Sequence, residues 1–341
     1  MSENVFEVEN LSLYYLGRFG DKTHAVTNVS FSMKQGEILG IAGESGCGKS
    51  TLVSGLMGMC IPPLYPEGDG DVRVKSGDKM ESLMNRSIED VRKNVLAQKV
   101  SMIPQGAFNA LNPVRKIKDI AADVIAAHQQ PGKHLDKKEV YDRLCERFDL
   151  FGMDTKRVLD SYPIQLTAGE RQRSVIGIST LLNPQMVIAD EPTSALDVST
   201  QKEVIKLIFD LLDKGIFSTM IFITHELPLL YHVADNIAIM YAGEFVEKGT
   251  AEQVVKDPRH PYTQALMGAM LSTEASQRNR HPVAIEGAPP SLRNKITGCR
   301  FADRCCKCAQ SSAELREKCL SSELPPKIAD AEHFAYCYNI K

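Results

Sequence analysis

A glycine-rich turn between an apolar run and a helix-forming segment constrains the fold of this chain more than any other feature. The apolar residues 38–42 predict a buried strand, and the segment KSTLVSGLMG from Lys49 onward predicts a helix. The turn between them reads GESGCGKS over residues 43–50 and fits the pattern G-x-x-x-x-G-K-[ST] without a gap. This combination predicts an α/β fold with a phosphate-binding loop, here called the P-loop (residues 43–50).

The residue types of the P-loop suit contact with phosphate groups. Its glycines allow the backbone to wrap around phosphates and to point N–H groups at them. Lys49 can reach the β- and γ-phosphates, and the Ser50 hydroxyl can ligate Mg²⁺. We therefore expect ATP and Mg²⁺ as ligands, with ATP bound by Gly43, Ser45, Gly46, Cys47, Gly48, Lys49, Ser50 and Thr51.

Polar side chains follow two further apolar runs. Asp190 and Glu191 come directly after residues 186–189, and a later run ends at Thr224 and His225. Asp190 suits the Mg²⁺ shell, and Glu191 is placed to orient or deprotonate an attacking water. Parallel strands bring their carboxyl ends to one edge of a sheet, so His225 could reach the γ-phosphate. We predict Glu191 and His225 as catalytic residues, the alternatives being a helix N-terminus for the acidic pair and a satisfied polar group for the histidine.

Charge and apolar patterning exclude other classes of protein. The 40 basic and 43 acidic residues give a net charge of -3, which lacks the basic excess that nucleic-acid binding requires. We therefore expect no nucleic-acid partner. The beginning of the chain has no basic segment followed by an apolar one, and no run of 18 apolar residues occurs. A cytosolic chain that does not itself span a membrane is expected.

Cysteines gather near the end of the chain. Six of the nine cysteines lie between Cys299 and Cys337, among few apolar runs and close to Pro325 and Pro326. In a cytosolic chain such cysteines are reduced thiols, metal ligands or catalytic groups rather than disulfides. The change in composition marks this tail as a separate unit.

Further motifs lie between the P-loop and His225, in a fixed order. They are SMIPQ, which ends at Gln105, LTAGE at residues 166–170, and SALD at residues 194–197. Together with the P-loop and the acidic pair, they resemble the motifs of the ATP-binding cassette ATPases. The segments GESGCGKS, LNPV, DEPTSALDVSTQ, ADNIAIMYAGEFVEKGT, DPRHPYTQALM and GAPPSL narrow the resemblance to the ATPases of oligopeptide, dipeptide and nickel permeases, from about residue 5 to residue 337.

The resemblance implies an ABC-type P-loop nucleotide-binding domain over residues 1–255. Its parts are a RecA-like core, an antiparallel β subdomain and a helical subdomain at about residues 115–165. A small cysteine-rich C-terminal extension, residues 256–341, follows. The early segment VFEVENLSLYYL alternates like a strand of the antiparallel sheet. We expect Tyr15 rather than Tyr14 to stack on adenine, with burial in the core as the alternative for either.

Several site residues follow from the resemblance alone. Gln105 would join Ser50 and Asp190 around Mg²⁺ and report the nucleotide state to membrane subunits. The D-loop would include Ser194 and Asp197. The signature loop, which is typically close to LSGGQ, would cap the ATP of a partner cassette with Thr167, Ala168, Gly169 and Glu170.

The signature loop departs from that pattern at two positions. Ala168 adds a methyl group and disfavours positive φ, and Glu170 brings a carboxylate toward an anionic ligand. The N-terminus of the following helix would offset part of that repulsion. We expect the ATP site that this loop caps to be weaker or slower than the chain's own, the alternative being that the loop tolerates both changes.

The resemblance also implies partners and a location. The chain would lie peripherally on the cytoplasmic face of the membrane, under two integral permease subunits fed by an extracytoplasmic solute-binding protein. A second, related cassette would complete a heterodimer. Peptides are the expected solute, with oligosaccharides or nickel chelates as alternatives. A soluble cassette ATPase of DNA repair or translation, and a redox protein with an attached ATPase, are the competing classes.

The resemblance places a [4Fe–4S] cluster on Cys299, Cys305, Cys319 and Cys337. Zinc is an alternative because Cys₄ sites also hold structural zinc, although the paired C-x-x-C knuckles typical of zinc are missing from this set. Unligated thiols are the third possibility. The extra Cys306 and Cys308 leave open which thiol of this group ligates. Since residues 43–225 contain none of the proposed ligands, we expect loss of the cluster to loosen the tail but to spare nucleotide binding.

Overall fold

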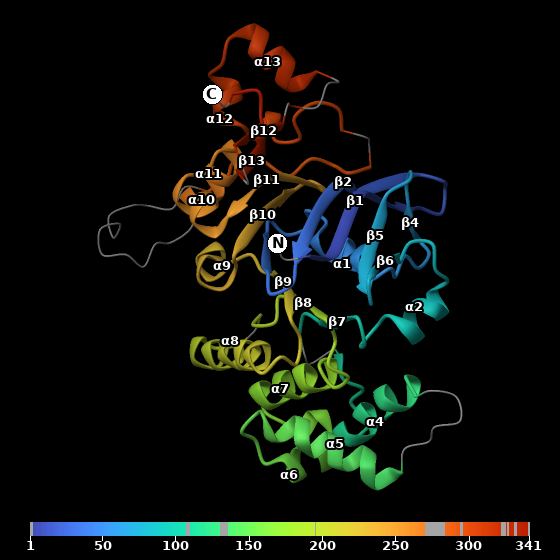
Figure 1. Ribbon diagram of the computed structural model, residues 1–341. Coiled ribbons are helices and arrows are strands. Elements are labelled where there is room, and N and C mark those ends of the chain that lie inside the picture. Colours follow the sequence, from blue (N-terminus) through green and yellow to red (C-terminus); the bar gives the residue numbers. More distant parts are fainter. Residues whose placement is uncertain are drawn as a thin grey trace.

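Two sheets with helices around them make up the structure (Figure 1). Among the described residues, the larger sheet has eight strands and the smaller has five. The computed structural model describes residues 3–106, 110–129, 136–194, 196–269, 284–293, 296–321, 325, 327–330 and 333–339.

The larger sheet has a parallel centre, in the order β10-β3-β9-β8-β7. Three of these strands, β3, β8 and β9, are buried along their whole length, which explains why the sequence reads there as unbroken apolar runs. The α/β core that those runs predict is confirmed. The strands are β3 (Ile38–Ala42), β7 (Val100–Ile103), β8 (Met186–Asp190), β9 (Thr219–Ile223) and β10 (Asn236–Tyr241).

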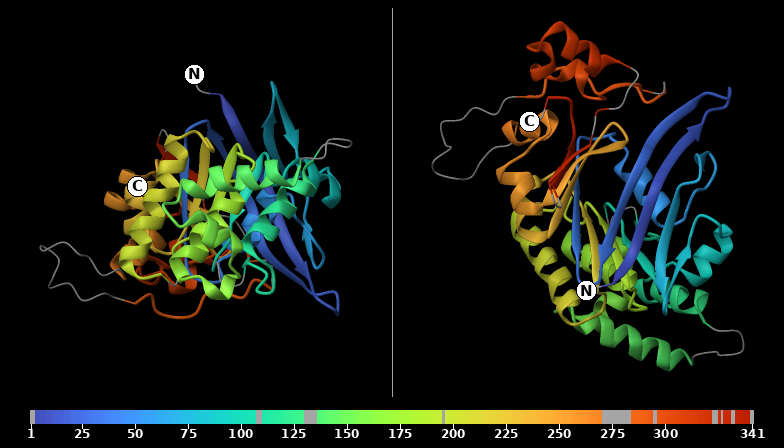
Figure 2. Two further views of the ribbon diagram at one scale, coloured as in Figure 1. Left: turned by 90° about the horizontal axis from the view of Figure 1, so that it is seen from below. Right: turned by 45° about the horizontal axis from the view of Figure 1, so that its top comes forward.

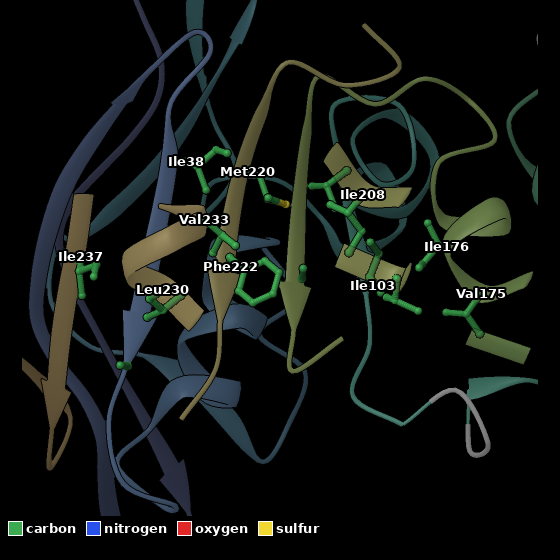
Figure 3. Close-up of a cluster of buried hydrophobic side chains, with 14 of the residues drawn as sticks. Ile38, Ile103, Val175, Ile176, Ile208, Met220, Phe222, Leu230, Val233 and Ile237 are labelled. Carbon is green, nitrogen blue, oxygen red and sulfur yellow. The ribbon is translucent and has the colours of Figure 1, made fainter. Parts of the chain in front are cut away.

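Helices pack on this sheet through a continuous apolar cluster (Figure 3). Leu230 of α9 lies close to β3, and a Cβ atom at Gly40 would come within 3.0 Å of its side chain. Gly40 therefore allows this helix to approach the strand closely. The helices here include α8 (Val198–Asp213), α9 (Leu227–Val233) and α10 (Ala251–Lys256).

The smaller sheet is antiparallel and lies beside the larger one (Figure 2). Helix α1 contacts both, and a Cβ atom at Gly55 would lie 2.6 Å from Leu13 Cδ1, so glycine is needed where α1 meets β1. The P-loop helix is thereby fixed against both sheets. The elements are β1 (Asn4–Leu16), β2 (Lys22–Lys34), α1 (Lys49–Leu56), β4 (Leu64–Pro66), β5 (Asp71–Ser76), β6 (Lys79–Ser82) and α2 (Ile88–Asn94).

A group of helices lies at the end of the molecule opposite the C-terminal region (Figure 1). In α4, the buried residues Ile117, Ala121 and Ile125 recur every four positions and form one apolar stripe. This spacing explains why the segment reads as helical. The elements are α4 (Ile117–Ala127), α5 (Lys137–Asp149), α6 (Thr155–Asp160), η1 (Pro163–Gln165) and α7 (Ala168–Ser179).

The C-terminal region extends the larger sheet. Strand β13 pairs antiparallel with β11, and the buried Glu247 of β11 accepts a hydrogen bond from His333 Nε2 at 2.7 Å. Glu247 also accepts from the backbone N–H groups of Arg259 and His260, both at 2.8 Å. The tail strands are therefore part of the core sheet. The elements are β11 (Glu244–Thr250), α11 (Pro261–Gly268), η3 (Ala302–Arg304), α12 (Cys306–Ala309), α13 (Ala313–Leu320), β12 (Lys327–Asp330) and β13 (His333–Tyr336).

Candidate functional site

The P-loop joins β3 to α1 in a conformation that requires glycine. Gly46 and Gly48 have φ values of 79° and 108°, in the left-handed region that side chains disfavour. A Cβ atom at Gly43 would lie 2.1 Å from Met240 O, and one at Gly48 would lie 2.2 Å from Ala25 O. Lys49 Nζ donates hydrogen bonds to Gly43 O at 2.7 Å and Glu44 O at 3.0 Å. The loop is therefore closely packed on neighbouring backbone.

A cavity of about 730 Å³ opens above this loop. Most of the residues that the sequence predicts for ATP and Mg²⁺ line it. They are Tyr15, Ser45, Gly46, Gly48, Lys49, Ser50, Thr51, Gln105, Asp190, Glu191 and His225.

Two residues of the predicted set do not line the cavity, and three unpredicted residues do. Gly43 packs against Met240 O, and the Cys47 thiol is buried, which raises its pKa. The unpredicted lining residues are Thr23, Ala25 and Leu292. No motif points to them, because they enter the site through the pairing of β1 with β2 and through the course of the C-terminal region.

Ser50 and Asp190 form the side of the cavity suited to a metal ion. Ser50 Oγ lies 3.4 Å from Asp190 Oδ2. Burial raises the pKa of Asp190, and the charge of the adjacent Glu191 raises it further. A divalent cation would offset both effects, and hydroxyl and carboxylate oxygens are ligands that Mg²⁺ accepts. Gln105, the third predicted ligand, is instead bonded to Glu191.

Glu191 lies between Gln105 and His225. Gln105 Nε2 donates to Glu191 Oε2 at 2.9 Å, and His225 Nδ1 lies 3.3 Å from Glu191 Oε1. The Glu191 backbone has a φ of 46°, rare for a residue with a side chain, and its N–H donates to Ile223 O at 2.9 Å. Strand β9 therefore holds Glu191 in a strained conformation that directs its carboxylate at the cavity.

The two adjacent tyrosines of β1 have different surroundings. Tyr15 lines the cavity, and its hydroxyl lies 3.2 Å from Thr51 Oγ1. Tyr14 stacks on Tyr65, with ring centroids 5.9 Å apart, and Lys22 Nζ lies 4.1 Å from the centre of its ring. Of this pair, Tyr15 is the one placed to meet a nucleotide base.

The signature loop has a different local geometry from the one expected. Thr167 caps α7, and its hydroxyl and N–H bond to the Glu170 carboxylate at 3.1 Å and 2.9 Å in a capping box. Glu170 also pairs with Arg157. Burial alone would raise the pKa of Glu170, but these hydrogen bonds lower it below its usual range. Glu170 therefore has a counter-charge in Arg157, in addition to the helix N-terminus that the sequence predicts as a partial offset.

The loop does not require positive φ at Ala168, so the backbone penalty that such a requirement would cause does not arise. Ala168 is the first residue of α7 and is not among the described residues with positive φ, so its methyl group causes no strain there. Thr167, Ala168, Gly169 and Glu170 lie outside the cavity of this chain. They are free of the chain's own nucleotide site.

The D-loop follows directly on Glu191. Ser194 N–H donates to Glu191 O at 3.1 Å, and Asp197 caps α8 by accepting from the N–H groups of Ser199 and Thr200. The N–H and hydroxyl donors of Thr200 and Ser199 lower the pKa of Asp197. Ala195, between the two predicted residues, lies outside the described residues.

The tail cysteines meet around a small cavity of about 10 Å³. Cys308 N–H points at Cys305 Sγ, 3.4 Å away, and Asn339 N–H at Cys337 Sγ, 3.3 Å away. Cys306 is exposed and takes no part. Burial raises the pKa of Cys299 and of Cys319 to about 12. The thiols that line the cavity are Cys299, Cys305, Cys308, Cys319 and Cys337.

Within the described ranges, no set of three or more His, Cys, Asp or Glu side chains has an arrangement that could hold a metal ion. The four predicted cluster ligands do converge, and Cys308 joins them. The cavity between them is at the lower limit of the roughly 10–15 Å³ that one water needs. The thiols fit a metal cluster in their chemistry but not in their present spacing.

The tail also reaches the P-loop, a contact that the sequence does not predict. Arg304, next to Cys305, forms an ion pair with Glu44 of the P-loop, with an N···O distance of 2.8 Å. Leu292 lines the nucleotide cavity, and its carbonyl oxygen accepts a hydrogen bond from His24 N–H at 2.8 Å.

The fold and these motifs define the chain as an ABC-type ATPase subunit. The family model "ABC transporter" matches residues 26–194, and the model "Oligopeptide/dipeptide transporter, C-terminal region" matches residues 246–311. The chain belongs to the family of oligopeptide and dipeptide ABC transporter ATP-binding subunits, for which ATP hydrolysis is the characteristic activity.

Relatives of known name match most of the chain. It is 35% identical to the dipeptide transport ATP-binding protein DppD of Caldanaerobacter subterraneus, over 88% of this chain and 88% of the relative. It is 37% identical to the oligopeptide transport ATP-binding protein OppD of Bacillus subtilis, over 88% and 81%. With AppF of the same organism, identity is 33% over 98% and 97%.

Solved structures support the fold of the cassette. The dimeric structure of MJ0796, described as a bacterial ABC transporter cassette, is 23% identical and superposes with a TM-score of 0.61 over 72% of this chain and 98% of that one. The structure of cbiO1 from Clostridium perfringens gives a TM-score of 0.59 over 75% and 92%. In the part of the chain described here, no helix is long and apolar enough to cross a bilayer.

Proposed function

We propose that this chain hydrolyses ATP to drive the import of peptides through two integral membrane subunits, which an extracytoplasmic binding protein supplies. The convergence of Gln105, Glu191 and His225 on the P-loop cavity carries the proposal. The solute is inferred from relatives named as dipeptide or oligopeptide transport proteins and from the match to the C-terminal family model.

The geometry supports a distinct role for each of the site residues. Lys49 and the P-loop N–H groups bind the β- and γ-phosphates, and Tyr15 stacks on the adenine. Ser50 and Asp190 would hold Mg²⁺, which neutralises charge on the transferred phosphoryl group. Glu191 accepts a proton from the attacking water, and His225 holds both Glu191 and the γ-phosphate in place. Gln105 senses nucleotide through its bond to Glu191.

A second cassette completes the site in this proposal. The signature residues 167–170 lie outside the chain's own cavity, where they can cap the nucleotide of a partner. Beside the D-loop, Val198 is 68% exposed although it is apolar, which suits an interface. Because the signature loop departs from the common pattern, the partner is proposed to be a different chain, in a heterodimer.

We propose that the segment between Gln105 and the signature loop contacts the membrane subunits. Val114 and Ile164 are 78% and 75% exposed, and these large apolar side chains flank the two motifs. Docking there would place the chain peripherally on the cytoplasmic face of the membrane.

The test of the proposed function is affinity capture of the tagged full chain from detergent-solubilised membranes of its own organism. Two integral subunits and a second cassette should be recovered, and their absence contradicts the transporter assignment.

We propose that four of the five converging thiols hold a [4Fe–4S] cluster, with zinc as the alternative. The N–H groups of Cys308 and Asn339, which point at sulfur atoms, suit thiolate ligands of a cluster. Cys305 and Cys308 compete for one ligand position, and Cys306 is left out. The thiols must move outward to admit the cluster, because the cavity is small.

A further inference from the structure

Glu44, the second residue of the P-loop, faces away from the nucleotide cavity and toward the C-terminal region. Its carboxylate accepts two hydrogen bonds from Arg304, at 2.8 Å from Nη1 and 3.1 Å from Nη2. The Arg304 side chain is 6% exposed and that of Glu44 is 24% exposed. A bidentate pair so shielded from water fixes position much more firmly than an exposed one.

The backbone of Glu44 is held at two further points. Its N–H donates to the Tyr262 hydroxyl at 2.9 Å, and its carbonyl oxygen accepts from Lys49 Nζ at 3.0 Å. Tyr262 belongs to α11, so two of the three anchors of this residue come from the C-terminal region. The P-loop segment that precedes Ser45 is thus fixed from outside the ATPase motifs.

Arg304 is itself fixed by other donors of its guanidinium group. Its Nε donates to Glu286 O at 3.0 Å, and its Nη1 also bonds to the Tyr241 hydroxyl at 3.1 Å. Gly287, with a φ of +78°, turns the chain past this side chain. The planar fork of arginine serves the carboxylate and the carbonyl together, which the single ammonium group of lysine does not.

The charge of Arg304 matters because of where Glu44 lies. A carboxylate next to the phosphate-binding loop, if left unpaired, would repel phosphates and attract the Lys49 ammonium that they need. The Arg304 guanidinium neutralises that carboxylate on the side away from the nucleotide.

We propose that Arg304 is a positioning residue for ATP binding, which holds the P-loop through Glu44 and so makes the C-terminal region part of the nucleotide site. The proposal rests on the assignment of the P-loop as the ATP site. It predicts a loss of ATP affinity rather than of turnover, since Arg304 touches none of the residues assigned to water activation.

The test is steady-state ATPase kinetics of the assembled transporter with four variants of this chain. Arg304→Gln should raise the KM for ATP about 10-fold, with kcat within about twofold of wild type, as expected for losing one bidentate charged contact. Arg304→Lys should restore little of the ATP affinity that Arg304→Gln loses. Glu44→Gln should raise the KM less, because the charge leaves with the ion pair. Adding Arg304→Gln to Glu44→Gln should then cause little further change.

Arg300→Gln is the matched control. Arg300 lies four residues earlier, and its buried side chain pairs with Glu244 at 2.9 Å and donates to Ala242 O; among the described residues it has no hydrogen bond or ion pair with a P-loop side chain. Its loss should leave the KM for ATP unchanged. Equal KM increases in both arginine variants, or a fall in kcat alone, would mean that Arg304 only docks the tail and would overturn the proposal.

The Lys49→Ala variant tests the assignment of the ATP site separately from the role of Arg304. If Lys49→Ala still binds ATP as wild type does, the assignment of the ATP site fails. If Lys49→Ala abolishes binding while Arg304→Gln keeps a wild-type KM, the site assignment stands and the role of Arg304 fails.

Discussion

Gln105 Nε2 donates a hydrogen bond to Glu191 Oε2 at 2.9 Å, which joins the end of β7 to the end of β8 across the mouth of the nucleotide cavity. The amide occupies one carboxylate oxygen and His225 lies 3.3 Å from the other. Any movement of Gln105 therefore alters the surroundings of the proposed general base directly.

Replacing that base should separate binding from hydrolysis. Glu191→Gln keeps the size of the side chain and removes its basicity, so we expect kcat in the assembled transporter to fall about 100-fold or more. The Kd for ATP should change less than about threefold. Glu203→Gln, on the outer face of α8, serves as a control for loss of a carboxylate and should keep wild-type turnover. Wild-type hydrolysis by Glu191→Gln would contradict the catalytic assignment.

The tyrosine pair of β1 allows a matched test of adenine contact. Tyr15→Ala should raise the Kd for ATP about 10-fold, in line with loss of one stacking partner, whereas Tyr15→Phe should keep most of the affinity. Tyr14→Ala loses its contact with Tyr65 and should lower the unfolding temperature without changing ATP affinity. Equal effects of the two alanine variants on Kd would show that Tyr15 supports the fold only.

The ion pair at the signature loop predicts an effect of Arg157. Glu191→Gln in this chain silences its own site, so that the remaining ATPase activity reports the partner site, which the signature loop caps. In that background Arg157→Gln should lower turnover several-fold, because it leaves the Glu170 carboxylate uncompensated near the partner's nucleotide. Adding Glu170→Gln should restore the activity, since glutamine also closes a capping box.

Glu170→Gln alone should have little effect there, because Arg157 already neutralises the carboxylate. If Glu170→Gln alone raised turnover strongly, the charge would act on the nucleotide despite the ion pair. If Arg157→Gln changed only the unfolding temperature, the pair would serve the helix cap and not the site.

Motifs that follow the chain in order could be read from the sequence, and contacts between distant segments could not. The apolar runs of β3, β8 and β9 predict buried parallel strands, and hence that Asp190 and His225 lie near the P-loop. The pairing of β13 with β11, and the ion pair of Arg304 with Glu44, depend on how the C-terminal region returns to the core sheet. No local pattern specifies that path, so the sequence predicts a separate tail.

The signature loop shows a different limit. The composition of LTAGE is visible in the sequence, but Arg157 lies 13 positions before Glu170 and reaches it only when α6 and α7 both pack against α4 and α5. The sequence therefore predicts the negative charge of Glu170 but not its neutralisation by Arg157.

Thiol reactivity should distinguish free cysteines from ligands in the tail. A thiol with a pKa of about 12, as burial gives Cys299 and Cys319, is ionised to about one part in 10⁴ at pH 8. In metal-free protein we therefore expect iodoacetamide to modify the exposed Cys306 much faster than Cys299 or Cys319, as measured by mass spectrometry over time. Raising the pH toward 10 should speed modification of Cys299 and Cys319, since their thiolate fraction grows tenfold per pH unit.

Metal content should then decide what the five converging thiols hold. Protein purified without oxygen should be brown and contain about four irons per chain if a [4Fe–4S] cluster is present, whereas one equivalent of zinc in colourless protein would contradict the cluster. Cys306→Ser should leave the metal content unchanged, because Cys306 is exposed and does not line the cavity between the other thiols. Cys305→Ser and Cys308→Ser, made separately, should differ in metal content, and the variant that loses metal identifies the ligand.

Chelation should also weaken ATP binding, because Arg304, adjacent to Cys305, holds the P-loop through Glu44. An unchanged ATP affinity after complete metal removal would show that the Arg304 contact survives without the metal.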